Sequence, residues 1–297
     1  MSQDLIAAKN TFFRKNLLIN CRGKLVDLST PKVMGILNLT PDSFHDGGRY
    51  TGEGQILSHI EKMLNEKADM IDIGAVSSRP GAKDVSEDEE KSRLLPILES
   101  IVKKFPELVI SIDTFRPGIA DSCLGIGASI INDIYAGTFD EKIFGVAAKH
   151  NAPLIIMHMQ NTPADMQESP QYEDVVLDVC DFLSSRYHKA IEMGVKDVII
   201  DPGFGFGKTV EHNYNLLHSL DYISNLFGIP ILAGISRKSM ISKLLEIRTD
   251  DTLNGTSALN MLALIKGACI LRVHDVKEAV EVRNLFIVSE HKPYDRI

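Results

Sequence analysis

An alternation of short apolar runs with helical segments is the feature that most limits the fold of this 297-residue chain. Each run leads into a polar, often glycine-rich turn and then into a stretch with helical periodicity. Near-continuous apolar strands indicate a parallel sheet covered on both faces, and their alternation with helices indicates βαβ units. The eight runs are Val33–Thr40, Met70–Ser77, Leu108–Thr114, Ser129–Ile134, Pro153–Met159, Asp197–Phe204, Ile229–Ser236 and Ala268–His274.

The number of repeats favours an α/β fold consisting of one (β/α)8 TIM barrel. Eight strand–helix units close such a barrel, and chains of this length form it as a single domain. An open doubly wound sheet is the competing architecture, but no linker rich in Pro and Ser divides the chain. Amphipathic helices are expected at Gly54–Lys67, Ser86–Lys104, Tyr172–Met193 and Leu253–Lys266.

A short β-hairpin is predicted ahead of the barrel. Leu17–Asn20 and Lys24–Leu28 flank the turn residues Arg22 and Gly23, which is typical of two antiparallel strands. We expect this hairpin to plug the N-terminal side of the barrel. The predicted division is therefore residues 1–30 for an N-terminal extension with the hairpin, and residues 31–297 for the barrel.

Composition excludes several classes of function. The formal net charge of −8 argues against a general nucleic-acid binder, which needs a basic face. Four cysteines without a C-x-x-C pair are typical of buried residues in a reducing compartment. The chain has no signal-peptide pattern and no uninterrupted apolar stretch of ~18 residues. We therefore expect a cytoplasmic protein that binds neither nucleic acid nor membranes.

Polar residues gather where the predicted strands end. In a barrel, the C-terminal ends of all strands meet at one rim. Several carboxylates buried in one ring are costly unless a ligand or partner charges satisfy them, so the set predicts a binding site. These strand-end residues are Asn38, Asp72, Asp113, Asn132, Asp133, His158, Asp201, Ser236, Arg237, Lys238, Arg272 and His274.

The last two strand ends predict a cationic corner. Arg272 and His274 are two residues apart on a strand, so both side chains project to the same side. Together with Lys238 they would occupy the place after strands seven and eight where barrels often hold a phosphate, and Arg offers it a planar donor fork. The alternative is an ion pair between Arg272 and Asp275 at the rim.

The segment Asp201–Thr209 combines a carboxylate with a glycine-rich loop that carries two aromatic rings. It is not a Walker A motif, because Pro202 stands where the first glycine is required, and Lys208 and Val210 occupy required glycine positions of G-x-G-x-x-G. A carboxylate accepts two parallel N–H bonds from an amidine-like edge, and an aromatic ring covers the face of such a group. The segment therefore suits a guanidine-containing heterocycle.

Two long loops follow the first two predicted strands. They span Asn38–Gly48 and Ser77–Lys83 and are rich in turn formers and polar groups. Long loops at this rim are usually lids or binding loops. Arg79 is well suited to reach across the rim, since Pro80 restricts the backbone beside it.

Eight motifs between about residue 33 and residue 276 resemble the dihydropteroate synthase family and occur in that family's order. One departure lies at the end of the second strand, where the family commonly reads Gly-Gly-Glu-Ser-Thr: here Val76 replaces the acid, whereas Ser78 keeps the hydroxyl. The motifs are Gly35-Ile-Leu-Asn-Leu-Thr-Pro-Asp-Ser-Phe44, Ser78-Arg-Pro-Gly-Ala82, Ser111-Ile-Asp-Thr114, Ile131-Asn-Asp-Ile134, Met157-His-Met159, Asp201-Pro-Gly-Phe-Gly-Phe-Gly-Lys208, Ser236-Arg-Lys238 and Arg272-Val-His-Asp275.

The resemblance implies a pterin-binding transferase. Such an enzyme joins p-aminobenzoate to 6-hydroxymethyl-7,8-dihydropterin pyrophosphate and releases 7,8-dihydropteroate and pyrophosphate. It also implies a homodimer and a Mg²⁺ ion ligated by Asn38, a hard oxygen donor. Carried over by position, the pterin-binding residues are Asp113, Asn132, Asp201 and Lys238, of which Asp113, Asp201 and Lys238 are also the catalytic residues. The pyrophosphate-binding residues are Asn38, Arg79, Arg272 and His274, and the p-aminobenzoate pocket comprises Ser78, Arg79, Pro80, Phe206 and Ser236.

The resemblance further suggests a dissociative substitution, in which the C–O bond at the pterin methylene breaks before the arylamine attacks. Asp113 and Asp201 would favour the resulting cation, whereas the magnesium ion, Arg272 and His274 would stabilise the leaving pyrophosphate. A methyltetrahydrofolate-dependent methyltransferase and a non-catalytic pterin-binding paralogue are the alternatives. The former handles no pyrophosphate, so it has no use for the cationic corner.

Overall fold

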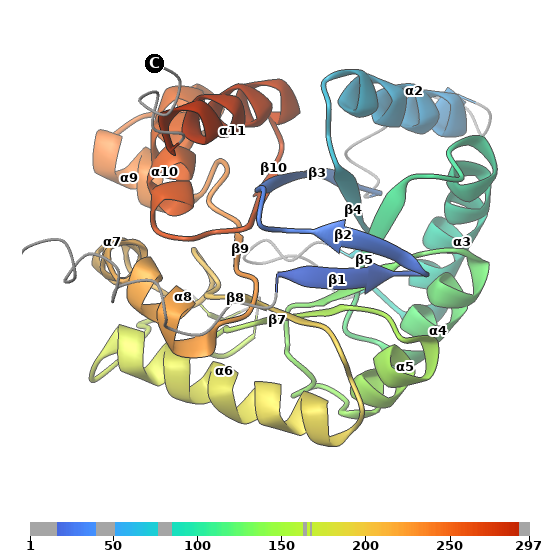
Figure 1. Ribbon diagram of the computed structural model, residues 1–297, viewed down its shortest axis with the longest axis horizontal. Coiled ribbons are helices and arrows are strands. Elements are labelled where there is room, and N and C mark those ends of the chain that lie inside the picture. Colours follow the sequence, from blue (N-terminus) through green and yellow to red (C-terminus); the bar gives the residue numbers. More distant parts are fainter. Residues whose placement is uncertain (1–16, 40–50, 77–84, 163–164, 167, 291–297) are drawn as a thin grey trace, which may run out of the picture.

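Eight parallel strands lie side by side in a nearly closed barrel, with helices around its outside (Figure 1). The structure is a computed structural model that describes residues 17–39, 51–76, 85–162, 165–166 and 168–290. The strand order is β8-β7-β6-β5-β4-β3-β10-β9, so the predicted barrel is confirmed. The strands are β3 (Lys32–Asn38), β4 (Met70–Gly74), β5 (Val109–Asp113), β6 (Ile130–Asp133), β7 (Leu154–Met157), β8 (Val198–Asp201), β9 (Leu232–Ala233) and β10 (Ile270–Val273).

The seam between β8 and β9 closes the barrel. An isolated parallel bridge joins Ile200 to Ile231, and the Ile200 N–H donates to the carbonyl of Pro230 at 3.0 Å. This contact rules out the open doubly wound sheet. It is a sparse junction, because β9 contains only two residues.

The helices follow the strands in the predicted alternation. Capping sets several of their boundaries: Asp174 accepts the N–H groups of Val176 and Leu177, so the helix predicted from Tyr172 begins at Val175 instead. The helices are α2 (Thr51–Asn65), α3 (Glu87–Lys104), α4 (Pro117–Ile126), α5 (Lys142–His150), α6 (Val175–Glu192), α7 (Val210–His218), α8 (Leu220–Phe227), α9 (Ser239–Leu245), α10 (Leu253–Ile265) and α11 (Val276–Glu290), with a 3₁₀ turn at Thr249–Asp251. None in the described part of the chain is long and apolar enough to cross a membrane.

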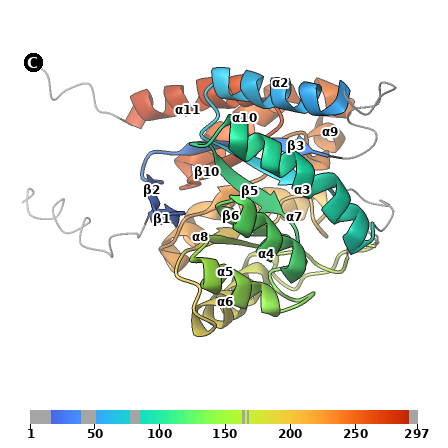
Figure 2. The same ribbon diagram turned by 90° about the vertical axis from the view of Figure 1, so that its right-hand side faces the viewer.

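The N-terminal hairpin lies at one end of the barrel (Figure 2). Its strands β1 (Leu18–Cys21) and β2 (Lys24–Asp27) pair antiparallel. The Asn20 N–H donates to Asp197 Oδ2 at 2.8 Å, and Arg22 Nη1 donates to the Gly127 carbonyl at 2.8 Å. Both partners precede strands, so the hairpin covers the N-terminal side, where we expected it. The division of the chain at residue 30 stays a prediction.

The barrel interior is apolar at that N-terminal side. Its lowest layer belongs to the same hydrophobic cluster as Ile19, Cys21 and Leu28 of the hairpin region. A separate, larger cluster fills the space between strands and helices. The polar strand-end residues therefore have one place to gather, which is the opposite, C-terminal rim. The interior layer consists of Met34, Met70, Val109, Ile130, Ile155, Ile199, Leu232 and Ile270.

Candidate active site

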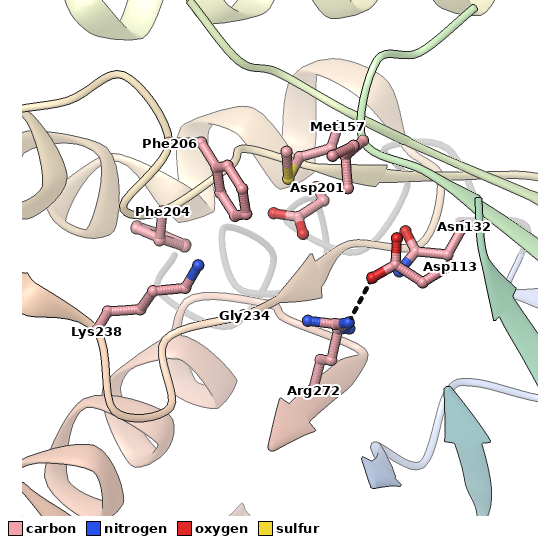
Figure 3. Close-up of a pocket in the computed structure, with 10 residues that line it drawn as sticks. Asp113, Asn132, Met157, Asp201, Phe204, Phe206, Gly234, Lys238 and Arg272 are labelled. Atoms are coloured by element: carbon pink, nitrogen blue, oxygen red, sulfur yellow. Dashed lines mark hydrogen bonds and ion pairs between the residues drawn. The ribbon is translucent and has the colours of Figure 1, made fainter. Parts of the chain in front are cut away.

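A pocket opens at the C-terminal ends of the strands, and Figure 3 shows the side chains that face it. Acidic groups from β5 and β8, an amide from β6 and two cationic groups point toward the same space. The residues that the sequence predicted and the structure brings together here are Asp113, Asn132, Asp201, Phe206, Lys238 and Arg272. The sequence reasoning missed Ile134, Met157, Phe204 and Gly234, which also line the pocket.

Arg272 is held by two carboxylates of the site. Its Nε lies 2.7 Å from Asp72 Oδ2, and its Nη2 lies 2.8 Å from Asp113 Oδ2. Asn132 Nδ2 donates to the same oxygen of Asp72 at 3.0 Å. The alternative ion pair with Asp275 is wrong, because Asp275 pairs with Arg237 instead, at 2.5 Å. Arg272 thus joins the predicted acidic and cationic parts of the site.

Asp72 is the main polar residue to which the sequence reasoning gave no role. It is completely buried and lies beneath the pocket, where Oδ2 fixes both Arg272 and Asn132. Its other oxygen, Oδ1, has no hydrogen-bond partner within the described ranges. The position of Asp72 at a strand end could have indicated a role in the site. Its ion pair with Arg272 could not be predicted, because that contact depends on which side chains fill the barrel interior.

The titratable groups of the pocket have shifted pKa values. Burial raises the pKa of Asp113 to about 7, although Arg272 acts in the opposite direction. Burial also raises the pKa of Asp201, against the Gly203 N–H and the nearby cations. Burial, followed by the charge of Arg272, lowers the pKa of Lys238 to about 8. Side-chain pKa values shifted toward 7 are common where groups are desolvated to act on a ligand.

Lys238 and Phe206 lie on the same side of the pocket. Lys238 is the N-cap residue of α9, and its Nζ lies 3.9 Å from the centroid of the Phe206 ring, a cation–π distance. The Asp201 carboxylate points toward the space between them and Arg272 (Figure 3). A flat ligand in this pocket would meet an aromatic ring, an ammonium and a carboxylate.

The glycine-rich loop after β8 is pressed against the end of β7. Gly203 has a φ of +73°, and a Cβ there would overlap the His158 carbonyl oxygen; at Gly207, with a φ of +60°, a Cβ would lie 2.6 Å from the Gln160 carbonyl oxygen. Glycine is the residue that allows both the positive φ and this close approach. The loop therefore has a fixed path, which carries Phe204 and Phe206 to the pocket.

His274 and Ser236 form a pair at the rim, outside the set that lines the pocket. Ser236 Oγ lies 3.1 Å from His274 Nδ1 and accepts the His274 N–H at 3.2 Å. The Ser236 side chain is buried, whereas His274 is exposed. Ser236 therefore lies beside His274, which the sequence predicted to bind pyrophosphate. Its predicted role in the p-aminobenzoate pocket stays a prediction.

The remaining predicted residues lie at the start of the two long loops. Asn38 is the half-buried last residue of β3 and aligns with Gly74 of β4. Ser78, Arg79 and Pro80 lie outside the described residues. Their predicted roles, and most of both loops, are therefore untested.

Two strand-end residues serve the local structure instead of the pocket. Asp133 is buried and accepts the N–H groups of Tyr135 at 2.9 Å and Gly137 at 2.6 Å, which closes the turn after β6. His158 is buried, and its Nδ1 lies 2.9 Å from Lys208 Nζ. Neither side chain lines the pocket. Polar strand ends are thus divided between ligand-facing groups and turn-forming groups.

Comparisons with known proteins agree with this geometry. A family model described as pterin binding enzyme matches residues 34–274. Dihydropteroate synthase of Escherichia coli K12 is 41% identical over 280 residues, which is 92% of this chain and 98% of that protein. The Haemophilus influenzae enzyme of the same name is 45% identical over 255 residues, 85% of this chain and 92% of that protein.

Solved structures extend the likeness to three dimensions. Yersinia pestis dihydropteroate synthase, solved with a sulfonamide drug complex, superposes with a TM-score of 0.86 at 40% identity and covers 93% of this chain and 100% of its own. The Xanthomonas albilineans enzyme with 4-aminobenzoic acid gives 0.86 at 38% identity, over 93% of this chain and 99% of its own. Fold and sequence agree, and the chain belongs to the dihydropteroate synthase family.

Proposed function

We propose that this transferase makes 7,8-dihydropteroate from 6-hydroxymethyl-7,8-dihydropterin pyrophosphate and p-aminobenzoate. The observation that carries the proposal is the pocket in which Asp113, Asn132, Asp201, Lys238 and Arg272 meet at the C-terminal rim. Support also comes from relatives, since the Xanthomonas albilineans enzyme was solved with 4-aminobenzoic acid. A methyltetrahydrofolate-dependent methyltransferase has no pyrophosphate to hold, so it accounts less well for Arg272 beside the rim residue His274.

The acidic part of the pocket suits the pterin ring. Asp201 presents a buried carboxylate that can accept two parallel N–H bonds from the amidine-like edge of the heterocycle. Asn132 has an amide that can both donate and accept, and its orientation is set by Asp72. Lys238 would donate to an acceptor atom of the ring, because its Nζ points into the same pocket.

The proposed reaction is a dissociative substitution at the exocyclic methylene carbon. The C–O bond breaks, its electron pair leaves with pyrophosphate, and the electron-rich dihydropterin delocalises the positive charge. Asp113 and Asp201 lie where their carboxylates would stabilise this cation. The arylamine nitrogen then forms the C–N bond and loses its proton afterwards, so no strong general base is required.

The leaving pyrophosphate would be held at the cationic corner. Arg272 is fixed through Nε and Nη2, so its charge stays at the wall of the pocket. His274 is exposed to incoming oxygen atoms and is held through Ser236. Arg79 completes the proposed set, by its place in the second loop.

Magnesium fits the donor set that the chain offers. The described residues contain no cluster of three or more His, Cys, Asp or Glu placed to hold a metal ion, so a closed protein cage is not the expected form. Mg²⁺ commonly keeps water and takes one or two protein ligands together with substrate phosphates. The amide oxygen of Asn38 is a suitable hard donor, and the bound ion would neutralise charge on the leaving pyrophosphate.

The p-aminobenzoate ring would lie beside Phe206. That ring borders the pocket next to Lys238, so an arylamine there would pack against an aromatic face inside the same pocket as the pterin. Ser236 and the second-loop residues Ser78, Arg79 and Pro80 complete the proposed pocket. The loops that begin at Asn38 and Ser77 would close over the two substrates.

A homodimer is part of the proposal. Exposed large apolar side chains are concentrated on α9, α10 and α11, which lie together in Figure 1. Large exposed apolar patches mark interaction surfaces, and the side chains on these three helices form the proposed one. Leu285→Glu should yield a monomer in sedimentation analysis, and an unchanged sedimentation coefficient would contradict a dimer through this face. The residues are Leu244, Leu245, Leu253, Leu262, Ile265, Leu285 and Val288.

The proposed compartment is the cytoplasm. All four cysteines are buried thiols, which is the state a reducing compartment maintains. Burial also raises the pKa of Cys21 and Cys123 to about 12. The proposed partners are the two small substrates and a second copy of the chain, without nucleic acid or membrane.

A coupled assay for pyrophosphate tests the proposal. With pterin pyrophosphate present, release should depend on added p-aminobenzoate, and dihydropteroate should form in equal amount. Release that does not depend on p-aminobenzoate would contradict the synthase. Tight binding of the pterin without any turnover would identify a non-catalytic paralogue, and methyl transfer from methyltetrahydrofolate would identify the methyltransferase.

A further inference from the structure

Lys208 is a buried cation that the reaction above does not use. It is only 3% exposed. Its Nζ donates to the carbonyl oxygens of Gly203 at 2.9 Å, Phe206 at 3.0 Å and His158 at 3.3 Å, and it lies 2.9 Å from His158 Nδ1. An ammonium has three N–H groups, so these four acceptors account for its whole hydrogen-bonding capacity. No phosphate site is left on it.

The ammonium lacks the partner that usually accompanies a buried lysine. Among the residues that the structure describes, no carboxylate forms an ion pair with Lys208; Asp201 acts only through its longer-range charge. A lysine is rarely fully buried unless it is paired, and burial lowers the pKa of Lys208 to about 7. Carbonyl dipoles therefore provide most of the compensation, and the backbone that carries them must keep its path.

That backbone is the 202–207 loop, which folds back around Nζ. The carbonyls of Gly203 and Phe206 turn inward onto the ammonium, while the Phe204 and Phe206 side chains face the pocket. The same turn directs the Gly203 N–H to Asp201 Oδ1 at 2.7 Å. The loop end is held separately, because Tyr172 donates its hydroxyl to the Gly207 carbonyl at 2.7 Å.

We propose that Lys208 is a positioning residue for the arylamine side of the pocket. Its ammonium fixes the 202–207 loop so that the Phe206 ring stays against Lys238 and borders the space for p-aminobenzoate. The pterin contacts of Asp113, Asn132 and Arg272 depend on it less, because these residues come from other strands. The kinetic part of this inference rests on the proposed function, whereas the position of the Phe206 side chain does not.

A tryptophan reporter tests the structural part without any turnover. The chain contains no Trp, so Phe206→Trp places its single tryptophan on the loop, where it can be excited selectively. In that background, Lys208→Met should lower the fluorescence anisotropy of the tryptophan and shift its emission to the red. Lys266→Met is the matched control, since Lys266 Nζ also donates to a carbonyl, that of His218 at 2.6 Å, but far from the pocket. The control should leave both signals unchanged.

Kinetics with the natural Phe206 test the functional part. Lys208→Met should raise the KM for p-aminobenzoate about tenfold, the size expected for losing one charge-assisted bond. The Kd for pterin pyrophosphate should change less than about threefold. Lys208→Gln retains N–H donors and should recover part of the p-aminobenzoate KM; it also provides the measurement if the Met variant fails to fold.

The proposal is overturned if the anisotropy of the reporter is unchanged in Lys208→Met. Equal losses toward both substrates, or a loss that follows only the fraction of folded protein, would also overturn it. If the parent protein shows no p-aminobenzoate-dependent release of pyrophosphate, the proposed function fails. The fluorescence comparison still decides whether Lys208 positions the loop in that case.

Discussion

Removal of Arg272 should destabilise the fold by an amount that the structure allows us to estimate. Arg272→Met leaves Asp72, which is fully buried, and Asp113 without the guanidinium that lies 2.7 and 2.8 Å from them. Breaking a buried ion pair by deleting one partner costs about 3–5 kcal/mol. At roughly 2.1 cal/mol/K per residue, the unfolding entropy of 297 residues converts this loss into a fall in melting temperature of about 5–8 °C.

Thermal unfolding followed by circular dichroism measures this loss, and a double-mutant cycle assigns its cause. Asp72→Asn removes the buried charge, so Arg272→Met should cost much less in that background than in the parent. Additive effects, within about 0.5 kcal/mol, would refute the reasoning. Arg248→Met is the control: its pair with Asp251 is exposed, and exposed pairs contribute little.

The same variant should respond to pH in a defined direction. The pKa of Asp113 is raised to about 7 in the folded protein, so the stability that this carboxyl contributes is fully present below its ordinary pKa. It is lost as the pH rises through about 7. Arg272 opposes the rise in pKa, so without it the folded-state pKa lies higher. The melting temperature of the variant should therefore keep falling above about pH 7, where the loss from this group has ended in the parent. Parallel pH profiles would argue against this.

Two further predictions concern the loop and the reaction. Gly203→Ala should lower the free energy of unfolding by at least about 3 kcal/mol, because it combines strain at positive φ with overlap of the His158 carbonyl. Gly228 also has a positive φ but open space around it. Gly228→Ala should therefore lower the free energy of unfolding by only about 1 kcal/mol in a melting experiment. Equal losses of stability in the two variants would show that the overlap with the His158 carbonyl costs nothing. Asp113→Asn should reduce kcat much more than substrate affinity in steady-state and binding measurements, because in the proposed mechanism the carboxylate acts on a cation that exists only during reaction. Equal losses in both would contradict this role.

Much of the fold could be predicted because the relevant information is local. Each strand is an apolar run, and each run ends in polar residues that cannot remain in a core, which is why Asp113, Asn132 and Asp201 could be placed at one rim. Adjacent residues on a strand point to opposite sides. Asn132 and Asp133 therefore could not both face the pocket, and the structure shows that Asp133 closes a turn instead.

The contacts that could not be predicted join residues far apart in sequence. Asp72 and Arg272 are 200 positions apart, and their meeting depends on which side chains fill the barrel between the apolar layer and the pocket. The surroundings of Lys208 could not be predicted, because a glycine-rich segment does not reveal whether its carbonyls or its N–H groups turn inward. The loop path decided this, since the carbonyls are directed onto Nζ.

The sparse junction between β8 and β9 divides the two sides of the substrate pocket. Asp201 ends β8, while Gly234 and Lys238 follow β9, so the pocket wall crosses the place where a single bridge links Ile200 to Ile231. Strand pairs with so few backbone hydrogen bonds are the ones that open at least cost. The distance between the Asp201 carboxylate, proposed to bind the pterin, and the ammonium beside Phe206 is therefore set by the most compliant part of the barrel. Small outward movements there would widen the proposed space for the arylamine without disturbing the apolar layer beneath it.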